Sequence, residues 1–196
     1  MGRGCAADVA RTWLIDTCVL YPAYLRDTIL RLANAGIIRV AWTEDILDEL
    51  QRNLAARIGP QPALRIVSLI RQHFPEAIVT GHEALIPRMS NHPKDRHVLA
   101  AAIRAEAAGV VTFNLVDFDI TRAGPQGDAV APIHPDALLL HRLRHAPSLF
   151  LRTLEEQVDG YRDPRMRVLD LASALERCGC PDTAKEIRRR VGSVRR

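Results

Sequence analysis

Long apolar runs are absent from this sequence of 196 residues. No stretch reaches the roughly 18 apolar residues that a membrane-spanning helix needs, so we expect none. The segment up to Arg11 holds two arginines but no apolar stretch followed by a small-residue cleavage site. It therefore predicts no secretory signal.

Cysteine is scarce, with four residues in the chain. That number is too small for a disulfide scaffold, and without a signal peptide we expect a cytoplasmic protein in a reducing compartment. Cys178 and Cys180 form a C-x-C pair, but a zinc site usually takes four ligands and the nearest other cysteine is Cys18. The favoured interpretation is that the pair fills apolar space around Gly179 at a helix end.

Lysine is almost missing: the chain has 2 Lys and 25 Arg. Residues 1–140 hold 14 basic and 15 acidic residues, whereas residues 141–196 hold 13 basic and 8 acidic residues, a net charge of +5. Arginine binds phosphate groups bidentately, which suits an RNA backbone. A genome that favours arginine codons explains the excess equally well, so charge alone assigns no function.

The hydrophobic pattern alternates between short strand-like runs and helical periodicity. Thr43 is a good N-cap, with Glu44 and Asp45 in the first turn of the helix that follows it. Such alternation predicts an α/β fold with a mainly parallel sheet, followed by a C-terminal region of two or three helices. Strands are expected at residues 11–15, 37–42, 77–79, 110–113 and 130–133, and helices at 22–35, 44–54, 64–74, 96–108 and 135–143.

Four acids stand where such a fold places chemistry. Asp16 directly follows the first strand, Asp117 lies just past a later one, and ligands collect beyond the carboxyl ends of parallel strands. Asp95 precedes an apolar helix, and Glu49 lies at the edge of the apolar side of another. Each acid also has a structural explanation, because Asp is common in caps and turns and Glu on exposed helix faces.

If the fold brings the four carboxylates together, they repel one another strongly unless a cation lies between them. Oxygen ligands suit Mg²⁺ or Mn²⁺, which also bind phosphate. The reaction expected of such a site is metal-assisted hydrolysis of a phosphodiester bond.

Four segments, in this order and spacing, resemble PIN-domain nucleases, and more closely the VapC type, the toxins of bacterial toxin–antitoxin pairs. The resemblance runs from about residue 11 to 143. The segments are Leu14-Ile15-Asp16-Thr17-Cys18-Val19-Leu20-Tyr21-Pro22, Trp42-Thr43-Glu44-Asp45-Ile46-Leu47-Asp48-Glu49, Asp95-Arg96-His97-Val98-Leu99-Ala100-Ala101-Ala102 and Val111-Thr112-Phe113-Asn114-Leu115-Val116-Asp117-Phe118.

The resemblance implies a three-layer α/β/α sandwich in residues 11–143, with residues 144–196 as a helical C-terminal extension. It implies a metal-dependent endoribonuclease that acts as a toxin, with Mg²⁺ or Mn²⁺ as cofactor, RNA as substrate, an antitoxin protein as partner and commonly a homodimer. The implied catalytic and metal-binding residues are Asp16, Glu49, Asp95 and Asp117, with Thr17, Thr112 and Asn114 in support.

Two positions depart from the family pattern. Asn114 stands where the family has an acid or an amide, which is why Asp117 is assigned as the fourth carboxylate. Lys94 stands where relatives often carry an acid, and it either contacts the scissile phosphate or weakens metal binding beside Asp95. Arg96 and His97 are further RNA-contact candidates, although Arg96 also fits a surface ion pair and His97 fits packing.

Two other classes of function remain. A PIN-fold protein that binds RNA without cleaving it fits the presence of Lys94 and Asn114. A response-regulator-like module also has an acid after its first strand, but it needs a lysine after a late core strand. The two lysines, Lys94 and Lys185, do not occupy that place.

Overall fold

The computed structural model describes residues 11–118 and 130–193. In these ranges the strands are β1 (Thr12–Ile15), β2 (Arg39–Ala41), β3 (Gly109–Val111) and β4 (Ala131–Ile133). The α-helices are α1 (Thr17–Leu20), α2 (Ala23–Asn34), α3 (Glu44–Ile58), α4 (Pro60–His73), α5 (Arg96–Arg104), α6 (Pro135–His145), α7 (Pro147–Asp159), α8 (Val168–Arg177) and α9 (Pro181–Ser193). The 3₁₀ helices are η1 (Pro75–Ala77), η2 (Glu83–Arg88), η3 (Pro93–Asp95) and η4 (Leu115–Phe118).

The chain separates into two compact units by its contacts. Among the described residues, the first unit holds 11–21, 39–118 and 130–133, and the second unit holds 22–38 and 134–193. The division differs from the boundary expected after residue 143, because α2 and α6 pack with the C-terminal helices. The division into a domain at residues 11–143 and an extension at residues 144–196 stays a prediction.

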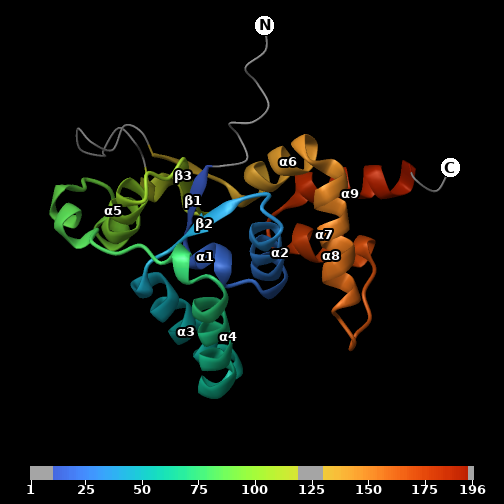
Figure 1. The fold of residues 1–196 in the computed structure, drawn as a ribbon, viewed down its shortest axis with the longest axis horizontal. Helices are drawn as coiled ribbons and strands as arrows, with labels where there is room; N and C mark the ends of the chain where they lie inside the picture. The colour runs from blue at the N-terminus through green and yellow to red at the C-terminus, as the bar shows by residue number, and fades with distance from the viewer. Residues whose placement is uncertain (1–10, 119–129, 194–196) are drawn as a thin grey trace, which may run out of the picture. The chain divides into compact units, whose positions relative to one another are not determined.

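The first unit is built on a parallel sheet with the strand order β2-β1-β3-β4 (Figure 1). Leu14 pairs with Ala41 on one side and with Val110 on the other, and Val111 pairs with Ile133. Helix α5 packs against β1 and β3. Its small buried residues, Ala100, Ala101 and Ala102, permit a close approach to the sheet. The predicted α/β class with a mainly parallel sheet is confirmed.

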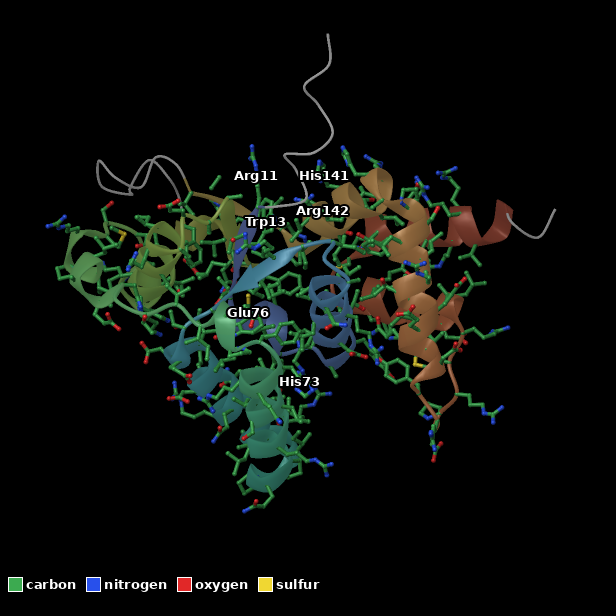
Figure 2. The ribbon with its side chains drawn as sticks, viewed as in Figure 1. Arg11, Trp13, His73, Glu76, His141 and Arg142 are labelled. Carbon is green, nitrogen blue, oxygen red and sulfur yellow. The ribbon has the colours of Figure 1, made fainter. Side chains whose placement is uncertain are left out.

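Glycine is required at the start of β3. A Cβ atom on Gly109 would lie 2.5 Å from the carbonyl oxygen of Ala131 and 3.0 Å from the indole ring of Trp13. Figure 2 labels Trp13 and its neighbour Arg11 at the amino end of β1. Because the strands are parallel, their carboxyl ends, which Asp16 and Thr112 follow, lie at the opposite edge of the sheet.

Helix α3 begins as its sequence predicts. The hydroxyl of Thr43 accepts a hydrogen bond of 3.2 Å from the backbone N–H of Ile46. Gly59, at φ 88°, ends the helix in a conformation that favours glycine. Helix α4 then returns beside α3 as a hairpin (Figure 1).

The prediction of a strand at residues 77–79 is wrong. Residues 75–77 form η1, and Ile78 makes an isolated parallel bridge to Trp42. Two backbone bonds hold the segment, from the N–H of Trp42 to Ala77 and from the N–H of Val79 to Trp42. Pro75, which lacks an N–H and favours a turn, leaves too little extended chain for a ladder.

The second unit packs α2 with the C-terminal helices α6 to α9. Thr28 on α2 donates a hydrogen bond of 2.9 Å to the side-chain oxygen of Gln157 on α7. The carboxylate of Asp136 on α6 accepts from the backbone N–H groups of Asp182 and Thr183 at 2.9 and 2.8 Å, and so caps α9. The predicted C-terminal helices are confirmed. None of the helices in the described ranges has the length and apolarity to cross a membrane.

Candidate functional site

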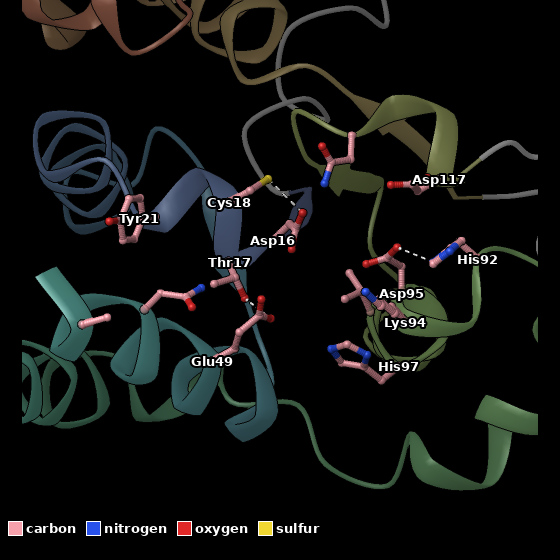
Figure 3. A pocket seen from close by; sticks show the side chains of 14 residues that line it. Asp16, Thr17, Cys18, Tyr21, Glu49, His92, Lys94, Asp95, His97 and Asp117 are labelled. Carbon is pink, nitrogen blue, oxygen red and sulfur yellow. Dashed lines mark hydrogen bonds and ion pairs between the residues drawn. The ribbon is translucent and has the colours of Figure 1, made fainter.

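A pocket of about 840 Å³ in the first unit is lined by side chains that follow the carboxyl ends of the strands. All four predicted acids, Asp16, Glu49, Asp95 and Asp117, line it. Thr17, Asn114, Lys94 and His97 line it as well (Figure 3). Segments that lie 101 positions apart in the chain, from Asp16 to Asp117, therefore contribute to one cavity.

Asp16 is fixed at the end of β1. Its backbone N–H donates to the carbonyl of Val111 at 3.0 Å, which extends the β1–β3 ladder by one bond. Its side chain is 7% exposed, and Oδ2 accepts from the hydroxyl of Thr112 at 2.7 Å and from the thiol of Cys18 at 2.9 Å. The carboxylate makes no cap hydrogen bond to α1, although Asp16 occupies the N-cap position. It is therefore directed to the pocket rather than used in capping.

Thr112 and Cys18 connect the ends of β1 and β3. Thr112 is fully buried, and its hydroxyl accepts the backbone N–H of Asn114 at 3.0 Å while donating to Asp16. The sulfur of Cys18 accepts the backbone N–H of Phe113 at 3.4 Å. Burial, then the negative charge of Asp16, raises the pKa of Cys18 to about 12. The thiol is therefore a hydrogen-bond donor to Asp16 in this structure.

Glu49 reaches the pocket from α3. The hydroxyl of Thr17 donates to Oε2 of Glu49 at 2.9 Å and contacts the carbonyl of Ile46 at 3.4 Å. Thr17 directly follows Asp16, so one short segment of chain orients two of the predicted acids.

Asp95 ends η3 and stands at the N-cap position of α5, where its side chain makes no cap hydrogen bond. Nδ1 of His92 lies 3.5 Å from its Oδ2. Partial burial raises the pKa of Asp95, and the negative charges of Asp16 and Asp117 raise it further, while His92 and His97 lower it. The carboxylate of Asp95 is thus repelled by Asp16 and by Asp117 across the pocket.

Asp117 and Asn114 come from the segment after β3. Asp117 lies in η4 and is half-buried, and its carbonyl accepts the backbone N–H of His92 at 3.4 Å. Asn114 is exposed and lines the pocket beside it. This backbone bond ties the loop that carries Asp95 to the segment that carries Asp117.

The three RNA-contact candidates differ in position. Lys94 is exposed and His97 half-buried, and both line the pocket. Arg96 is not among the described residues that line it, and its Nε donates to the carbonyl of Asn91 at 3.3 Å. The guanidinium of Arg96 thus contacts the backbone of its own loop.

Sequence reasoning missed several lining residues, among them Cys18, Tyr21, His92 and Asn53. A signal existed for Asn53, which lies four positions after Glu49 and so shares its face of α3. Cys18 stands two positions after Asp16, but which way its side chain points depends on the turn into α1. His92 has no local signal, because a loop brings it to the site.

The four acids, with Thr17 and Asn114, offer the oxygen ligands that a hard divalent cation prefers, in a pocket that Lys94, His92, His97 and Cys18 also line. Within the described residues, no three His, Cys, Asp or Glu side chains lie close enough together to hold a metal ion between them. The repulsion at Asp95 is the electrostatic condition that a bound cation relieves. The residues fit Mg²⁺ or Mn²⁺ by chemistry and charge.

Comparison with known proteins gives a consistent result for both parts of the chain. A family model described as PIN domain matches residues 12–115, and one described as VapC50 C-terminal domain matches residues 135–189. A protein of Mycobacterium tuberculosis (strain ATCC 25618 / H37Rv), named "Putative ribonuclease VapC50", is 38% identical over 99 residues. The match covers 50% of this chain and 57% of that relative, so the two chains align over little more than half of the relative's length. No solved structure matches.

Proposed function

The chain belongs to the PIN-domain family, and from that premise we propose that it is a metal-dependent endoribonuclease that hydrolyses RNA phosphodiester bonds. The observation that carries the proposal is that Asp16, Glu49, Asp95 and Asp117, which come from distant parts of the chain, line one pocket. A chain gains nothing in stability from several carboxylates in one pocket, so a site that keeps them is typical of cation binding. The similarity to a protein named as a ribonuclease supports the same class of reaction.

Four side chains would hold the cation: Asp16, Glu49, Asp95 and Asp117. When bound, Mg²⁺ or Mn²⁺ lowers the pKa of a coordinated water and offsets charge on the phosphate. The protein's own contribution is orientation. Thr112 and Cys18 hold Oδ2 of Asp16, and Thr17 holds Oε2 of Glu49, so the orientation of both pocket-lining carboxylates is fixed.

We assign Lys94 and His97 to binding the RNA backbone. Both line the same pocket as the acids, and Lys94 brings an ammonium group to an otherwise acidic wall. We assign Lys94 to the phosphate next to the cleaved bond, where its positive charge stabilises the RNA. Arg96 is assigned to positioning its own loop rather than to RNA, since its Nε already donates to Asn91.

Cleavage of a structured RNA in Mn²⁺ tests this function. The wild-type protein is expected to produce 5′-phosphate and 3′-hydroxyl ends, the result when water attacks phosphorus and the 3′ oxygen is the leaving group. Asp16→Asn and Asp95→Asn should each lose cleavage, and a chelator should abolish it in the wild type. Asp45→Asn is the matched control, because Asp45 is an exposed acid on α3 outside the pocket. Cleavage that survives both Asp16→Asn and Asp95→Asn rules the proposal out.

We further propose that the enzyme is the toxin of a toxin–antitoxin pair that acts in the cytoplasm as a homodimer. The support is the match of residues 135–189 to the VapC50 C-terminal domain. The antitoxin partner would bring an arginine or lysine into the acidic pocket. Induced expression of the wild type should arrest growth, while expression of Asp95→Asn should not. Growth arrest by both proteins contradicts the toxin role.

A PIN-fold protein that binds RNA without cleaving it is the second candidate. Lys94 beside Asp95 and the lack of a preformed three-ligand group in the described ranges favour it. The cleavage assay separates the two functions when RNA binding is measured on the same samples. RNA binding that is independent of Mn²⁺, with no cleavage, supports the binding protein.

A further inference from the structure

The pocket is longer than a cation and one phosphate require. Glu49, Asn53 and Ala56 all line it, and their spacing of four and three residues places them on one face of α3. At about 1.5 Å per residue, the seven positions from Glu49 to Ala56 extend the pocket by roughly 10 Å along the helix. This length lies beyond the acids.

The far part of the pocket differs chemically from the acidic part. Tyr21 lines the pocket as well, and the guanidinium carbon of Arg57 lies over the Tyr21 ring, 5.8 Å from its centroid. Because Arg57 follows Ala56, this contact places Tyr21 beside the later turns of α3. Figure 3 shows the same separation, with Tyr21 at one side of the view and Asp117 and His92 at the other.

An aromatic ring, a primary amide and a nearby guanidinium are the groups that bind an unstacked nucleobase. Bases of single-stranded RNA stack on aromatic side chains and Arg planes and form hydrogen bonds with amides. Asn53 is exposed and supplies both a donor and an acceptor. Ala56, also exposed, lines this part of the pocket with only a methyl group.

We propose that Tyr21, Asn53 and Ala56 form a nucleobase subsite for a base that flanks the cleaved phosphate. The inference rests on the proposed ribonuclease function, since the acids fix where the phosphate lies. Tyr21 supplies the stacking surface and Asn53 reads the edge of the base. Arg57 holds the tyrosine ring and adds positive charge at this end.

Fluorescence anisotropy with single-stranded RNA tests the subsite. The probes are four labelled homopolymers, of A, C, G or U, and an abasic chain of equal length and charge. All proteins carry Asp95→Asn so that binding is read without cleavage. The protein with Asp95→Asn alone should bind its preferred homopolymer about 5- to 150-fold more tightly than the abasic chain, the range expected for stacking of one base.

Added to that background, Tyr21→Leu and Ala56→Leu should remove this preference, the first by losing the aromatic face and the second by filling the subsite. Tyr21→Phe should retain it. Ala137→Leu is the matched control, because Ala137 is an exposed helical alanine on α6 that does not line the pocket. Leucine is a good helix former, so both alanine variants should fold.

The subsite is overturned if base-bearing and abasic chains bind equally, including the case where neither binds, or if Tyr21→Leu and Ala56→Leu keep the preference. Failure of the ribonuclease function has a different signature, namely no Mn²⁺-dependent cleavage by the wild type. If the wild type does not cleave RNA but the base preference is present, the subsite proposal stands and the ribonuclease proposal is wrong.

Discussion

The hydroxyl of Thr112 donates a hydrogen bond of 2.7 Å to Oδ2 of Asp16, although 96 positions separate the two residues in the chain. Thr112 is 0% exposed and Asp16 is 7% exposed, so little water competes for this bond. The contact joins the carboxyl ends of β1 and β3 and holds one oxygen of the carboxylate that the proposed cation needs. The sheet therefore sets the orientation of Asp16.

Thr112→Val should weaken metal-dependent cleavage. Valine has nearly the shape of threonine but donates no hydrogen bond, so the Asp16 carboxylate loses its shortest contact. Loss of a group that orients a metal ligand typically costs about 10- to 100-fold in metal affinity or activity. The measurement is the Mn²⁺ concentration that gives half-maximal RNA cleavage.

Thr112→Ser is the control for that variant, because serine keeps the hydroxyl and removes only the methyl group. Thr112→Ser should retain most of the wild-type affinity for Mn²⁺. A Thr112→Val protein that folds normally and needs no more Mn²⁺ than the wild type contradicts the orienting role.

Mn²⁺ should raise the unfolding temperature of the wild-type protein. A ligand at a hundred times its Kd stabilises the native state by about 2.7 kcal/mol, which is roughly 5–10 °C for a chain of this size. Asp95→Asn should abolish the shift. Differential scanning calorimetry with and without Mn²⁺ measures both effects.

Without metal, Asp95→Asn should unfold at a higher temperature than the wild type. Burial and the charges of Asp16 and Asp117 raise the pKa of Asp95, so its ionised form is disfavoured in the folded protein. The neutral amide removes that repulsion at pH 7. Asp45→Asn serves as the reference, and a metal-free Asp95→Asn protein that is less stable than wild type argues against carboxylate repulsion in the pocket.

Local sequence patterns predict much of the fold. Thr43 with Glu44 and Asp45 marked the start of α3, and the apolar segments around Leu14 and Val110 marked the central strands, because capping and burial are decided within a few residues. The segment after Pro75 shows the limit of such patterns: its apolar residues resemble a strand, but the turn at Pro75 leaves too little extended chain for a ladder.

Local sequence patterns predict less of the site than of the fold. Asp16 and Asp95 were named from their places after a strand and before a helix, and both line the pocket. The contacts that orient them depend on tertiary structure. Cys18 reaches Asp16 through the turn into α1, and His92 reaches Asp95 through a loop. Neither contact follows from the helical or strand spacing of residues in the sequence.

Asp136→Ala should destabilise the C-terminal helices. The Asp136 carboxylate is 7% exposed and accepts the first N–H groups of α9 and the hydroxyl of Thr183, the latter at 2.6 Å. Alanine leaves the buried backbone N–H of Thr183 without this acceptor, while the Thr183 hydroxyl keeps its bond to the carbonyl of residue 136. Loss of a cap together with an unpaired buried donor costs about 2–4 kcal/mol. Urea unfolding followed by far-UV circular dichroism measures the change.

Asp136→Asn should fall between Asp136→Ala and the wild type, since its amide oxygen still accepts one of the bonds. Asp159→Ala is the reference substitution, because Asp159 is exposed at the end of α7. Equal stability of Asp136→Ala and Asp159→Ala would mean that α9 does not depend on this cap.

Glu186→Gln should show a stability difference that depends on pH. Hydrogen bonds from Arg189 and then Arg190 lower the pKa of Glu186 from 4.5 to about 2. A carboxyl whose folded pKa is depressed binds fewer protons when folded, so its stabilisation is complete above pH 4.5 and is lost as the pH falls toward 2. Since these ion pairs face solvent, the loss in Glu186→Gln at pH 7 should be below about 1 kcal/mol.

Urea unfolding of the wild type and Glu186→Gln at several pH values checks this expectation, with Glu155→Gln, an exposed glutamate on α7, as control. The two curves of unfolding free energy should converge as the pH falls from 4.5 toward 2. They should also converge at pH 7 in high salt, because screening weakens exposed pairs. A difference that persists in acid would mean that Glu186 stabilises α9 through packing rather than through its charge.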